Sequence, residues 1–384
     1  MSWISRGDDS KLTGWYFEID RRLLGCVLLM MLLSVMFALS AGSVAAERIG
    51  KSWHFFLVKA IPFYFAGLAF LFGGSFLNKK QVLIVAGLNL LFGLCLLPVT
   101  VFDPYMLKNS ARFIHMGFAN INIMPADIMK PGFIIMTAYF LSKMKERYGG
   151  EIFLNKDAWR FDTWLSWVWY LILFALVVCI IFNHPDFGTA VLYLGVFSAM
   201  IFVAGLPLIW VPVLVGVGAV MLIVAFFTLG HVHRRIISFF TGTGDTYQVD
   251  NSIDAIRHGG LFGSGDDAFV KQFLPDVHTD FIFAAIAEDA GAILACGVLL
   301  LLFFVFRRLI KNAIYSRDLF VLYAVSGTAA LFGGQICFNM LTTLNLFAPK
   351  GMTLPFISYG GSSLLSYCLL FGLILALIRE DKWK

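Results

Sequence analysis

Long apolar runs alternate with short polar segments along almost the whole chain. A transmembrane helix needs about 20 predominantly apolar residues to cross roughly 30 Å of hydrocarbon. Glu47 and Arg48 end the first run, which is too long for a cleaved signal peptide. The pattern therefore predicts an all-α polytopic membrane protein with about ten transmembrane helices, forming one domain over residues 1–384. The runs lie at about 23–43, 55–77, 82–101, 127–143, 163–183, 187–205, 206–228, 281–306, 319–342 and 356–378.

Lysine and arginine residues orient the predicted helices, because cytoplasmic loops of membrane proteins carry an excess of them. With the N-terminus inside, the inner segments hold 18 of the 29 Lys and Arg residues and the outer segments hold 9. This bias predicts cytoplasmic terminal segments, 1–22 and 379–384, and a large outer loop between the seventh and eighth helices, 229–280. Loops of this length are rarely plain coil and are usually functional, so we expect short helices at the membrane interface there.

The composition agrees with a membrane protein. Apolar residues make up 59% of the 384 residues and charged residues 14%, whereas soluble domains average about 45–50% and about 25%. The formal net charge of +5 is spread over many loops, so we expect no nucleic-acid partner. All six cysteines lie in apolar runs, where they behave as small hydrophobic residues, and neither a disulfide nor a metal site is indicated.

A carboxylate stands in segment 274–283, where the large outer loop meets the eighth predicted helix. Asp280 has two interpretations. As the N-cap of the helix, it would satisfy free backbone N–H groups and the helix dipole. As a general base, it would accept a proton from a substrate hydroxyl. The ionisable neighbours Lys271, Asp276 and His278 favour the second interpretation, because charge near lipid is costly.

The segment 349–363 contains two prolines, three glycines and a run of hydroxyl groups at the mouth of the last predicted helix. Irregular backbone at membrane depth persists only where protein or water covers it. Close packing of small residues would explain Gly360–Ser363 but not Lys350 or the prolines. Ser358 lacks the flanking glycines of a nucleophile elbow. Helix packing alone therefore does not account for this segment.

Asp127 and Lys130 stand three residues apart within a predicted span, on one face of a helix. Their simplest role is a mutual ion pair. Such pairs inside a membrane also tend to mark functional cavities, so both interpretations stay open at this point.

Three further motifs have ordinary explanations. The hairpin His184–Thr189 predicts a turn in which Asp186 caps the next helix. The glycine-rich Gly259–Gly265 lacks the Gly-Lys-Ser/Thr sequence and the βαβ context of a phosphate loop, which excludes nucleotide binding. His231 and His233 are interpreted as solvated loop residues rather than metal ligands.

Four motifs occur together and in a fixed order, at Asp186–Thr189, Gly244–Asp250, Leu274–Phe283 and Pro349–Ser363. This combination resembles the SEDS (shape, elongation, division, sporulation) family of peptidoglycan polymerases over essentially the whole chain. The N-terminal sequence, Arg22–Gly50, is most similar to the cell-division branch in its alphaproteobacterial form. The elongation branch shares the central motifs and is the nearest alternative.

The resemblance implies ten spans and a glycosyltransferase that acts on lipid II at the outer face of the inner (cytoplasmic) membrane. Asp280 matches the catalytic carboxylate of the family. The resemblance implies no certain metal ligand. The positions that match substrate-binding residues are Arg112, Asp127, Lys130, Lys271, His278, Lys350, Ser358, Ser362 and Ser363.

The chain departs from the family pattern in three motifs. The family's Gly-Ala-Arg-Arg-Trp reads Asn109–Phe113 here, so one of two arginines is missing. Its Gln-Pro-Ser-Glu reads Met124–Asp127, and its Gly-Glu-Glu-Leu-Gly reads Ala287–Gly291. The missing arginine removes one expected contact to an anionic group, which is consistent with a slower or more partner-dependent enzyme.

The leading hypothesis is a polymerase in which Asp280 takes the C4–OH proton of one lipid-linked disaccharide. Undecaprenyl diphosphate leaves from C1 of the other as an anion, so one carboxylate suffices where a glycosidase needs two. Positive charge near the diphosphate would come from side chains and from a divalent cation, Mg²⁺ or Mn²⁺, held by loop carboxylates. The candidate side chains are Arg112, Lys130, Lys271 and Lys350.

Two other classes of function compete with this hypothesis. A lipid II flippase predicts ionisable residues at the midplane of several spans, whereas the polar features here gather at the outer ends. A scaffold for division proteins needs no carboxylate at Asp280. The expected partners of the polymerase are a class B penicillin-binding protein and other divisome membrane proteins, in the membrane at the division septum.

Overall fold

The structure, a computed structural model, describes residues 11–102, 113–116, 121–163, 165–183, 186–241, 247–347 and 351–381. Its α-helices are α1 (Lys11–Glu18), α2 (Arg21–Arg48), α3 (Phe55–Ser75), α4 (Lys79–Phe102), α5 (Pro125–Ile128), α6 (Lys130–Tyr148), α7 (Trp167–Asn183), α8 (Phe187–Val203), α9 (Val211–Thr228), α10 (Gly230–Thr241), α11 (Tyr247–Gly259), α12 (Ile282–Ile314), α13 (Leu319–Thr343) and α14 (Gly361–Asp381). The other elements are strands β1 (Ile114–Met116) and β2 (Ile121–Ile123) and the 3₁₀ helices η1 (Gly149–Glu151), η2 (Lys156–Trp159), η3 (Leu208–Trp210), η4 (Gly265–Asp267) and η5 (Val270–Phe273).

A helix occupies each of the ten predicted spans. Seven helical segments in the described residues are long and apolar enough to cross a membrane: α2, α3, α4, η3 with α9, α12, α13 and α14. The helices α7 and α8 are apolar but shorter, and α6 carries several charged residues. The chain is therefore a helical polytopic membrane protein.

Two boundaries and one element differ from the sequence-based expectation. The last span begins at Gly361 rather than near 356, because the broken segment before it forms no helix. The fifth begins at Trp167, where Ser166 Oγ accepts a hydrogen bond from Val168 N at 3.2 Å. The antiparallel strands β1 and β2 depart from the all-α prediction. Their sequences, Ile-His-Met and Ile-Asn-Ile, alternate apolar and polar residues with the period of a strand.

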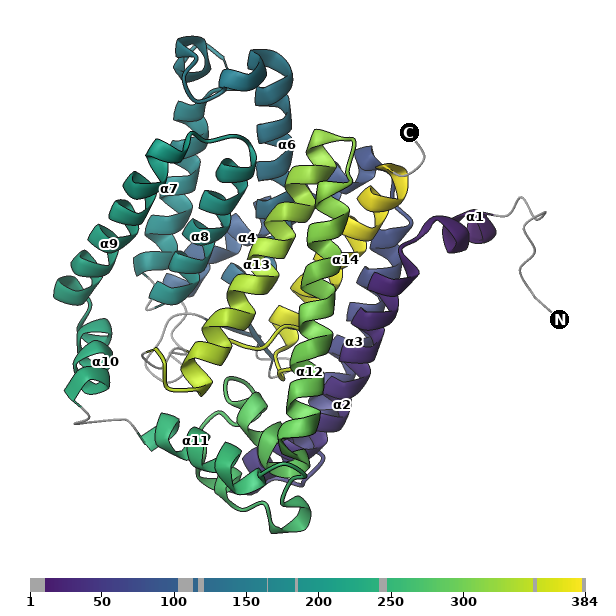
Figure 1. Ribbon diagram of the computed structural model, residues 1–384, viewed down its shortest axis with the longest axis vertical. Coiled ribbons are helices and arrows are strands. Elements are labelled where there is room, and N and C mark those ends of the chain that lie inside the picture. Colours follow the sequence, from purple (N-terminus) through teal and green to yellow (C-terminus); the bar gives the residue numbers. More distant parts are fainter. Residues whose placement is uncertain are drawn as a thin grey trace.

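The last helix, α14, lies inside the bundle and packs closely on α3 (Figure 1). A Cβ on Gly372 would lie 2.6 Å from Phe70 O and 2.8 Å from Leu71 O, so this crossing needs glycine. Because α14 follows directly after the broken segment, its burial fixes the position of that segment in the fold.

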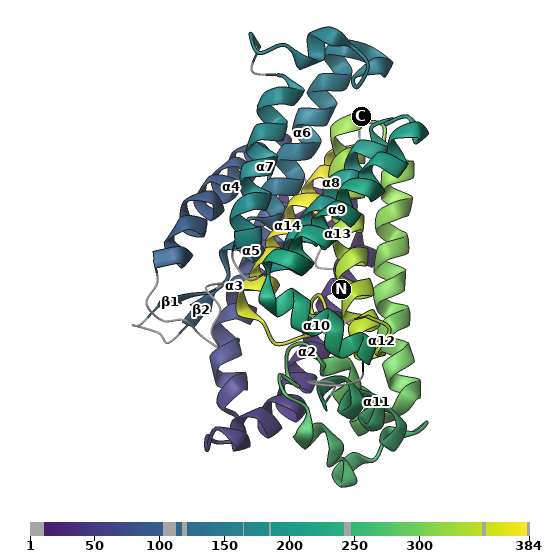
Figure 2. The ribbon, with the colours of Figure 1, turned by 90° about the vertical axis from the view of Figure 1, so that its left-hand side faces the viewer.

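The large loop between α9 and α12 contains α10, α11, η4 and η5, as the sequence predicts. Figures 1 and 2 show α11 at the end of the molecule opposite the C-terminus. His231 and His233 lie in this loop, on α10. This helix is strongly amphipathic, and His233 packs on the Phe226 ring.

The glycine-rich segment Gly259–Gly265 packs backbone to backbone against a break in α12. Gly291 interrupts α12 with φ 83° and ψ 169°. Ala292 N donates to Gly260 O at 2.9 Å, and Ser264 N donates to Glu288 O at 2.8 Å. A Cβ on Gly259 would collide with Ala287 O. The glycines therefore allow close approach to the broken helix.

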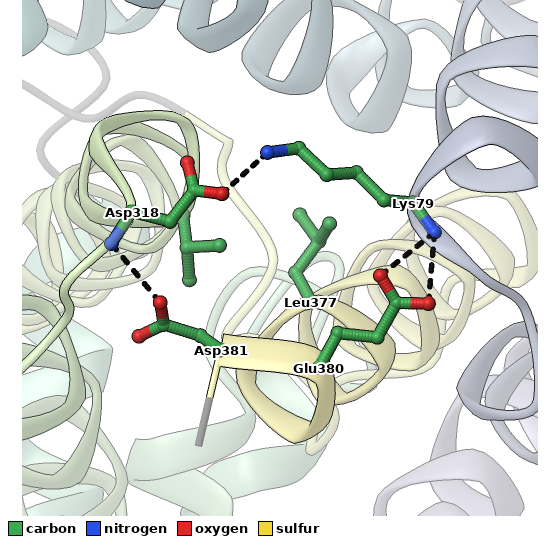
Figure 3. Close-up of a pocket in the computed structure, with 6 residues that line it drawn as sticks. Lys79, Asp318, Leu377, Glu380 and Asp381 are labelled. Carbon is green, nitrogen blue, oxygen red and sulfur yellow. Dashed lines mark hydrogen bonds and ion pairs between the residues drawn. The ribbon is translucent and has the colours of Figure 1, made fainter. Parts of the chain in front are cut away.

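A polar cluster ties the helices together at the C-terminal end of α14 (Figure 3). Lys79 N donates to both carboxylate oxygens of Glu380 at 3.1 Å, and the Lys79 ammonium pairs with Asp318. Asp381 accepts from Arg317 N and Asp318 N at 3.1 and 3.0 Å. The three carboxylates thus hold the starts of α4 and α13, which explains the cluster as a structural joint.

Candidate functional site

The two segments that the sequence singles out, 274–283 and 349–363, meet in the structure. Tyr359 N donates to His278 O at 2.9 Å, and Ser358 Oγ donates to Thr279 O at 2.5 Å. Ser358 Oγ also accepts from Leu354 N at 2.7 Å. The first two hydrogen bonds join the turn before α12 to the irregular backbone before α14, and the third holds that irregular backbone together. The broken segment is therefore covered by protein, as irregular backbone at membrane depth requires.

Asp280 is half-buried in this turn, and its carboxylate faces the backbone of the other segment. A Cβ on Gly351 would collide with Asp280 Oδ2, so any larger residue at 351 would displace the carboxylate. The N-cap position of α12 belongs to Phe281, and the helix begins at Ile282. The capping interpretation of Asp280 is therefore not supported.

Each of the two segments contains one residue with left-handed backbone. Asp276 has φ 52° and Phe356 has φ 61°, a region that non-glycine residues rarely adopt. Asp276 O accepts from Asp280 N at 3.0 Å. Phe356 is 2% exposed and packs on the Tyr367 and Phe371 rings. Each of the two segments that meet at Asp280 therefore contains one residue with strained backbone, a pattern common at functional sites.

The predicted ion pair between Asp127 and Lys130 is present. Lys130 Nζ lies 2.6 Å from Asp127 Oδ1, and the lysine is 3% exposed. Lys130 Nζ also donates to Gln335 Oε1 at 3.0 Å, and Gln335 Nε2 donates to Thr353 O at 2.8 Å. Asp127 lies at the end of α5 and Lys130 begins α6. The pair is thus connected through α13 to the segment that faces Asp280.

Ser362 and Ser363 are buried at the start of α14. Ser362 Oγ accepts from Met124 N at 3.0 Å, next to the start of α5. Ser363 Oγ lies 3.0 Å from Thr353 Oγ1. These hydroxyls, like that of Ser358, bond to groups of the chain itself, and their contact with a substrate stays a prediction.

Lys271 and His278 lie on the same loop but in different surroundings. The Lys271 ammonium pairs with Asp289 and donates to Ser40 Oγ at 3.1 Å. The His278 ring packs 4.4 Å from the Phe56 ring centroid and 5.4 Å from that of Tyr359. The structure therefore brings His278 to the Asp280 turn and ties Lys271 to the broken helix α12.

Three buried polar residues were not proposed as site residues by the sequence analysis. Glu288 is fully buried and accepts from Val270 N at 2.7 Å and Lys271 N at 2.6 Å. Gln335 and Asn339 lie on α13 and contact the broken segment. A polar residue inside an apolar run is the signal that would have found them.

Two predicted cations, Arg112 and Lys350, lie outside the described residues. Among the residues that the structure describes, no three His, Cys, Asp or Glu side chains gather closely enough to hold a metal ion. No chemical step is assigned to Mg²⁺ or Mn²⁺. Asp186 occupies the predicted N-cap position of α8, but its side chain makes no capping hydrogen bond.

Comparison with known proteins identifies the same family as the sequence motifs that meet at Asp280. The model of the FtsW/RodA/SpoVE family, described as "Cell cycle protein", matches residues 20–383. The chain belongs to this family. This confirms the resemblance to the peptidoglycan polymerases of shape, elongation, division and sporulation.

Relatives of known name match over nearly the full length. The probable peptidoglycan glycosyltransferase FtsW of Caulobacter vibrioides is 32% identical over 380 residues, covering 98% of this chain and 93% of the relative. The protein of the same name from Coxiella burnetii is 31% identical over 379 residues, covering 95% and 98%.

Solved structures share the fold. A chain of a peptidoglycan synthase complex that coordinates polymerization and crosslinking aligns with a TM-score of 0.73 at 23% identity, covering 95% of this chain and 99% of that one. The rod shape determining protein RodA of Thermus thermophilus aligns with a TM-score of 0.66 at 23% identity, covering 95% and 98%.

On the hypothesis that Asp280 is the base, Gly351→Ala should lower polymerising activity by roughly 10²-fold, because a misplacement of about 1 Å at a reacting group has an effect of that size. Gly360→Ala is the matched control, since its new Cβ would meet Thr353 Cγ2 at 3.4 Å, an ordinary contact. The measurement is the initial rate of each variant, with a melting curve. Equal rates for the two variants would show that Gly351 does not set the position of Asp280.

Proposed function

We propose that the chain is a peptidoglycan glycosyltransferase that polymerises lipid II into β-1,4 glycan strands during septal wall synthesis. One observation carries the proposal: the Asp280 carboxylate is held against Gly351 by two segments with strained backbone. Such preorganisation suits a reacting group, because the side chain need not be ordered when the substrate arrives. Membership of the family and relatives named peptidoglycan glycosyltransferase support the same chemistry.

In this mechanism Asp280 acts as the general base. It accepts the proton of the N-acetylglucosamine C4–OH as this oxygen attacks C1 of the muramyl unit of a second lipid II. The new O4–C1 bond forms while the bond from C1 to the diphosphate oxygen breaks, and undecaprenyl diphosphate leaves as an anion. General base catalysis of this kind is typically worth about 10²–10⁴ in rate.

The cationic candidates for binding the leaving diphosphate differ in whether a carboxylate already pairs with them in the described structure. Lys130 and Lys271 are each paired with a carboxylate, and their positive charge is already partly compensated. We therefore assign the diphosphate first to Arg112 and Lys350, with His278 lining the approach beside Asp280. Lys130 and Asp127 support the cavity through Gln335.

We also propose ten spans with cytoplasmic termini, which places the Asp280 turn at the outer face of the inner membrane. The positions of α11 and the C-terminus at opposite ends of the molecule support this arrangement (Figure 2). A reporter fused after Lys384 should be cytoplasmic, and one inserted near Thr243 should be outside. A cytoplasmic reporter at Thr243 would remove the catalytic proposal, because the glycan is assembled outside.

The proposed partners are a class B penicillin-binding protein, other divisome membrane proteins and the lipid II substrate in the septal membrane. One structural neighbour belongs to a peptidoglycan synthase complex, which supports a partner of this kind. An elongation polymerase is the second candidate, because a RodA shares the fold.

The test of the proposal is incubation of the purified chain with lipid II, alone and with its cognate class B penicillin-binding protein. Glycan polymer should form in at least one of the two reactions. The alternative, a lipid II flippase, predicts movement of a labelled lipid II across a vesicle bilayer and no polymer. Lipid II movement without polymer would contradict the glycosyltransferase assignment and favour a flippase.

A further inference from the structure

We propose that Asn339 is a positioning residue that fixes the Asp280 base relative to the segment before α14. The inference deepens the proposed function and rests on the assignment of Asp280 as the base. Asn339 lies on α13, far along the chain from the turn that it contacts, and it is 1% exposed.

The side-chain amide of Asn339 joins the two halves of the site. Its Nδ2 donates to Asp280 O at 2.8 Å and to Met352 O at 2.6 Å. An amide nitrogen carries two protons, so both are used in these contacts. Met352 is next to Gly351, whose Cα faces the Asp280 carboxylate. One side chain therefore sets the separation between the base and the backbone that it lies against.

The side-chain oxygen of Asn339 indicates that this residue does more than stabilise the fold. Its Oδ1 is buried and has no hydrogen-bond partner among the described residues. A buried acceptor without a partner destabilises the fold, and such a group in a native structure calls for an explanation. The two hydrogen bonds that Nδ2 donates explain why an amide stands at 339. An apolar residue there would avoid the unpaired oxygen but would lose both hydrogen bonds.

A second amide on α13, that of Gln335, makes a different set of contacts from Asn339. Gln335 is one turn earlier on α13 and donates to Thr353 O at 2.8 Å. Residues four apart share one face of a helix, so the two amides hold successive residues of the broken segment. Gln335 reaches the Lys130 ion pair, whereas Asn339 reaches the backbone of Asp280.

The experiment compares four variants of the full-length protein, with its cognate class B penicillin-binding protein present if polymerisation requires it. Asn339→Leu removes both donors at similar volume, and Asn339→Gln keeps them but lengthens the side chain. Thr328→Val is the matched control, since Thr328 is buried on α13 and its hydroxyl donates to Ala324 O of the same helix at 2.8 Å. Asp280→Asn reports on the base itself.

The measurements are kcat and KM for lipid II, with a melting curve for each variant. Both Asn339 variants should lose about tenfold or more in kcat, because they misplace the base, while KM stays within about twofold. Thr328→Val should keep the wild-type kcat. The melting curve separates positioning from a general loss of structure, because a smaller folded fraction would also lower the apparent kcat without changing KM.

Three results would overturn the inference. A folded Asn339→Leu or Asn339→Gln with wild-type kcat would show that the base needs no such support. A loss confined to KM would make Asn339 a substrate contact. A fall in melting temperature that accounts for the whole loss of kcat in Asn339→Leu would show that Asn339 only stabilises the fold. Polymerisation by Asp280→Asn would instead contradict the proposed function, whatever the Asn339 variants do.

Discussion

Asp127→Ala should lower the free energy of unfolding by about 3–5 kcal/mol, the usual effect of removing one partner of a buried ion pair. Lys130 is 3% exposed and lies 2.6 Å from Asp127. Its other hydrogen bond goes to the neutral Gln335, so the variant leaves a buried ammonium without a compensating charge. The measurement is a melting curve of the purified variant in detergent, together with its yield.

Two variants serve as controls for this prediction. Glu146→Ala breaks the exposed pair Lys143–Glu146, whose side chains are 39% and 55% exposed, and should cost less than about 1 kcal/mol. Lys130→Met combined with Asp127→Ala should recover much of the loss, because no buried charge remains. An Asp127→Ala protein that is as stable as wild type yet inactive would contradict the structural role of the pair.

Asp280→Asn should lower the rate of polymerisation by about 10²-fold or more and leave the fold intact. An amide has no useful proton affinity near neutral pH, so it cannot act as a general base. The backbone contacts of the turn remain, including Asn339 Nδ2 to Asp280 O at 2.8 Å. The melting temperature should therefore stay close to that of wild type. Asp254→Asn is the control, because Asp254 is an exposed carboxylate on α11 of the same loop.

The spans could be predicted from sequence because each is a local run of apolar residues. The same reasoning placed the start of the last span too early, near 356. Phe356 and Ile357 are apolar and buried, yet they belong to irregular backbone rather than to α14. Hydropathy reports burial, and it does not distinguish a helix from a covered broken segment.

Candidate residues for the site could be proposed from sequence motifs, but the contacts of these residues could not be predicted. The pattern of glycines in 349–363 indicates close approach of backbone, and only the fold shows that Gly351 faces Asp280. Asn339 and Gln335 lie in a run that hydropathy assigns simply to a span. Their importance depends on the packing of α13 against two segments distant in sequence, which no local pattern encodes.

The Lys271 prediction shows a different limit. The sequence presents Lys271 as an ionisable neighbour of Asp280, and its charge suggests a contact with an anionic substrate. In the fold it pairs with Asp289, and its backbone N–H donates to Glu288 at 2.6 Å. A cation can bind an anionic substrate only if the fold does not already pair it with a carboxylate. Such pairing depends on tertiary structure and cannot be predicted from the local sequence.

The most direct test of the account is the amount of glycan polymer that purified Asp280→Asn forms from lipid II, beside wild type and Asp254→Asn in the same assay. The account predicts abundant polymer from wild type and Asp254→Asn, and at most about 1% of that rate from a folded Asp280→Asn. Near-normal polymerisation by Asp280→Asn would contradict the assignment of this carboxylate as the base.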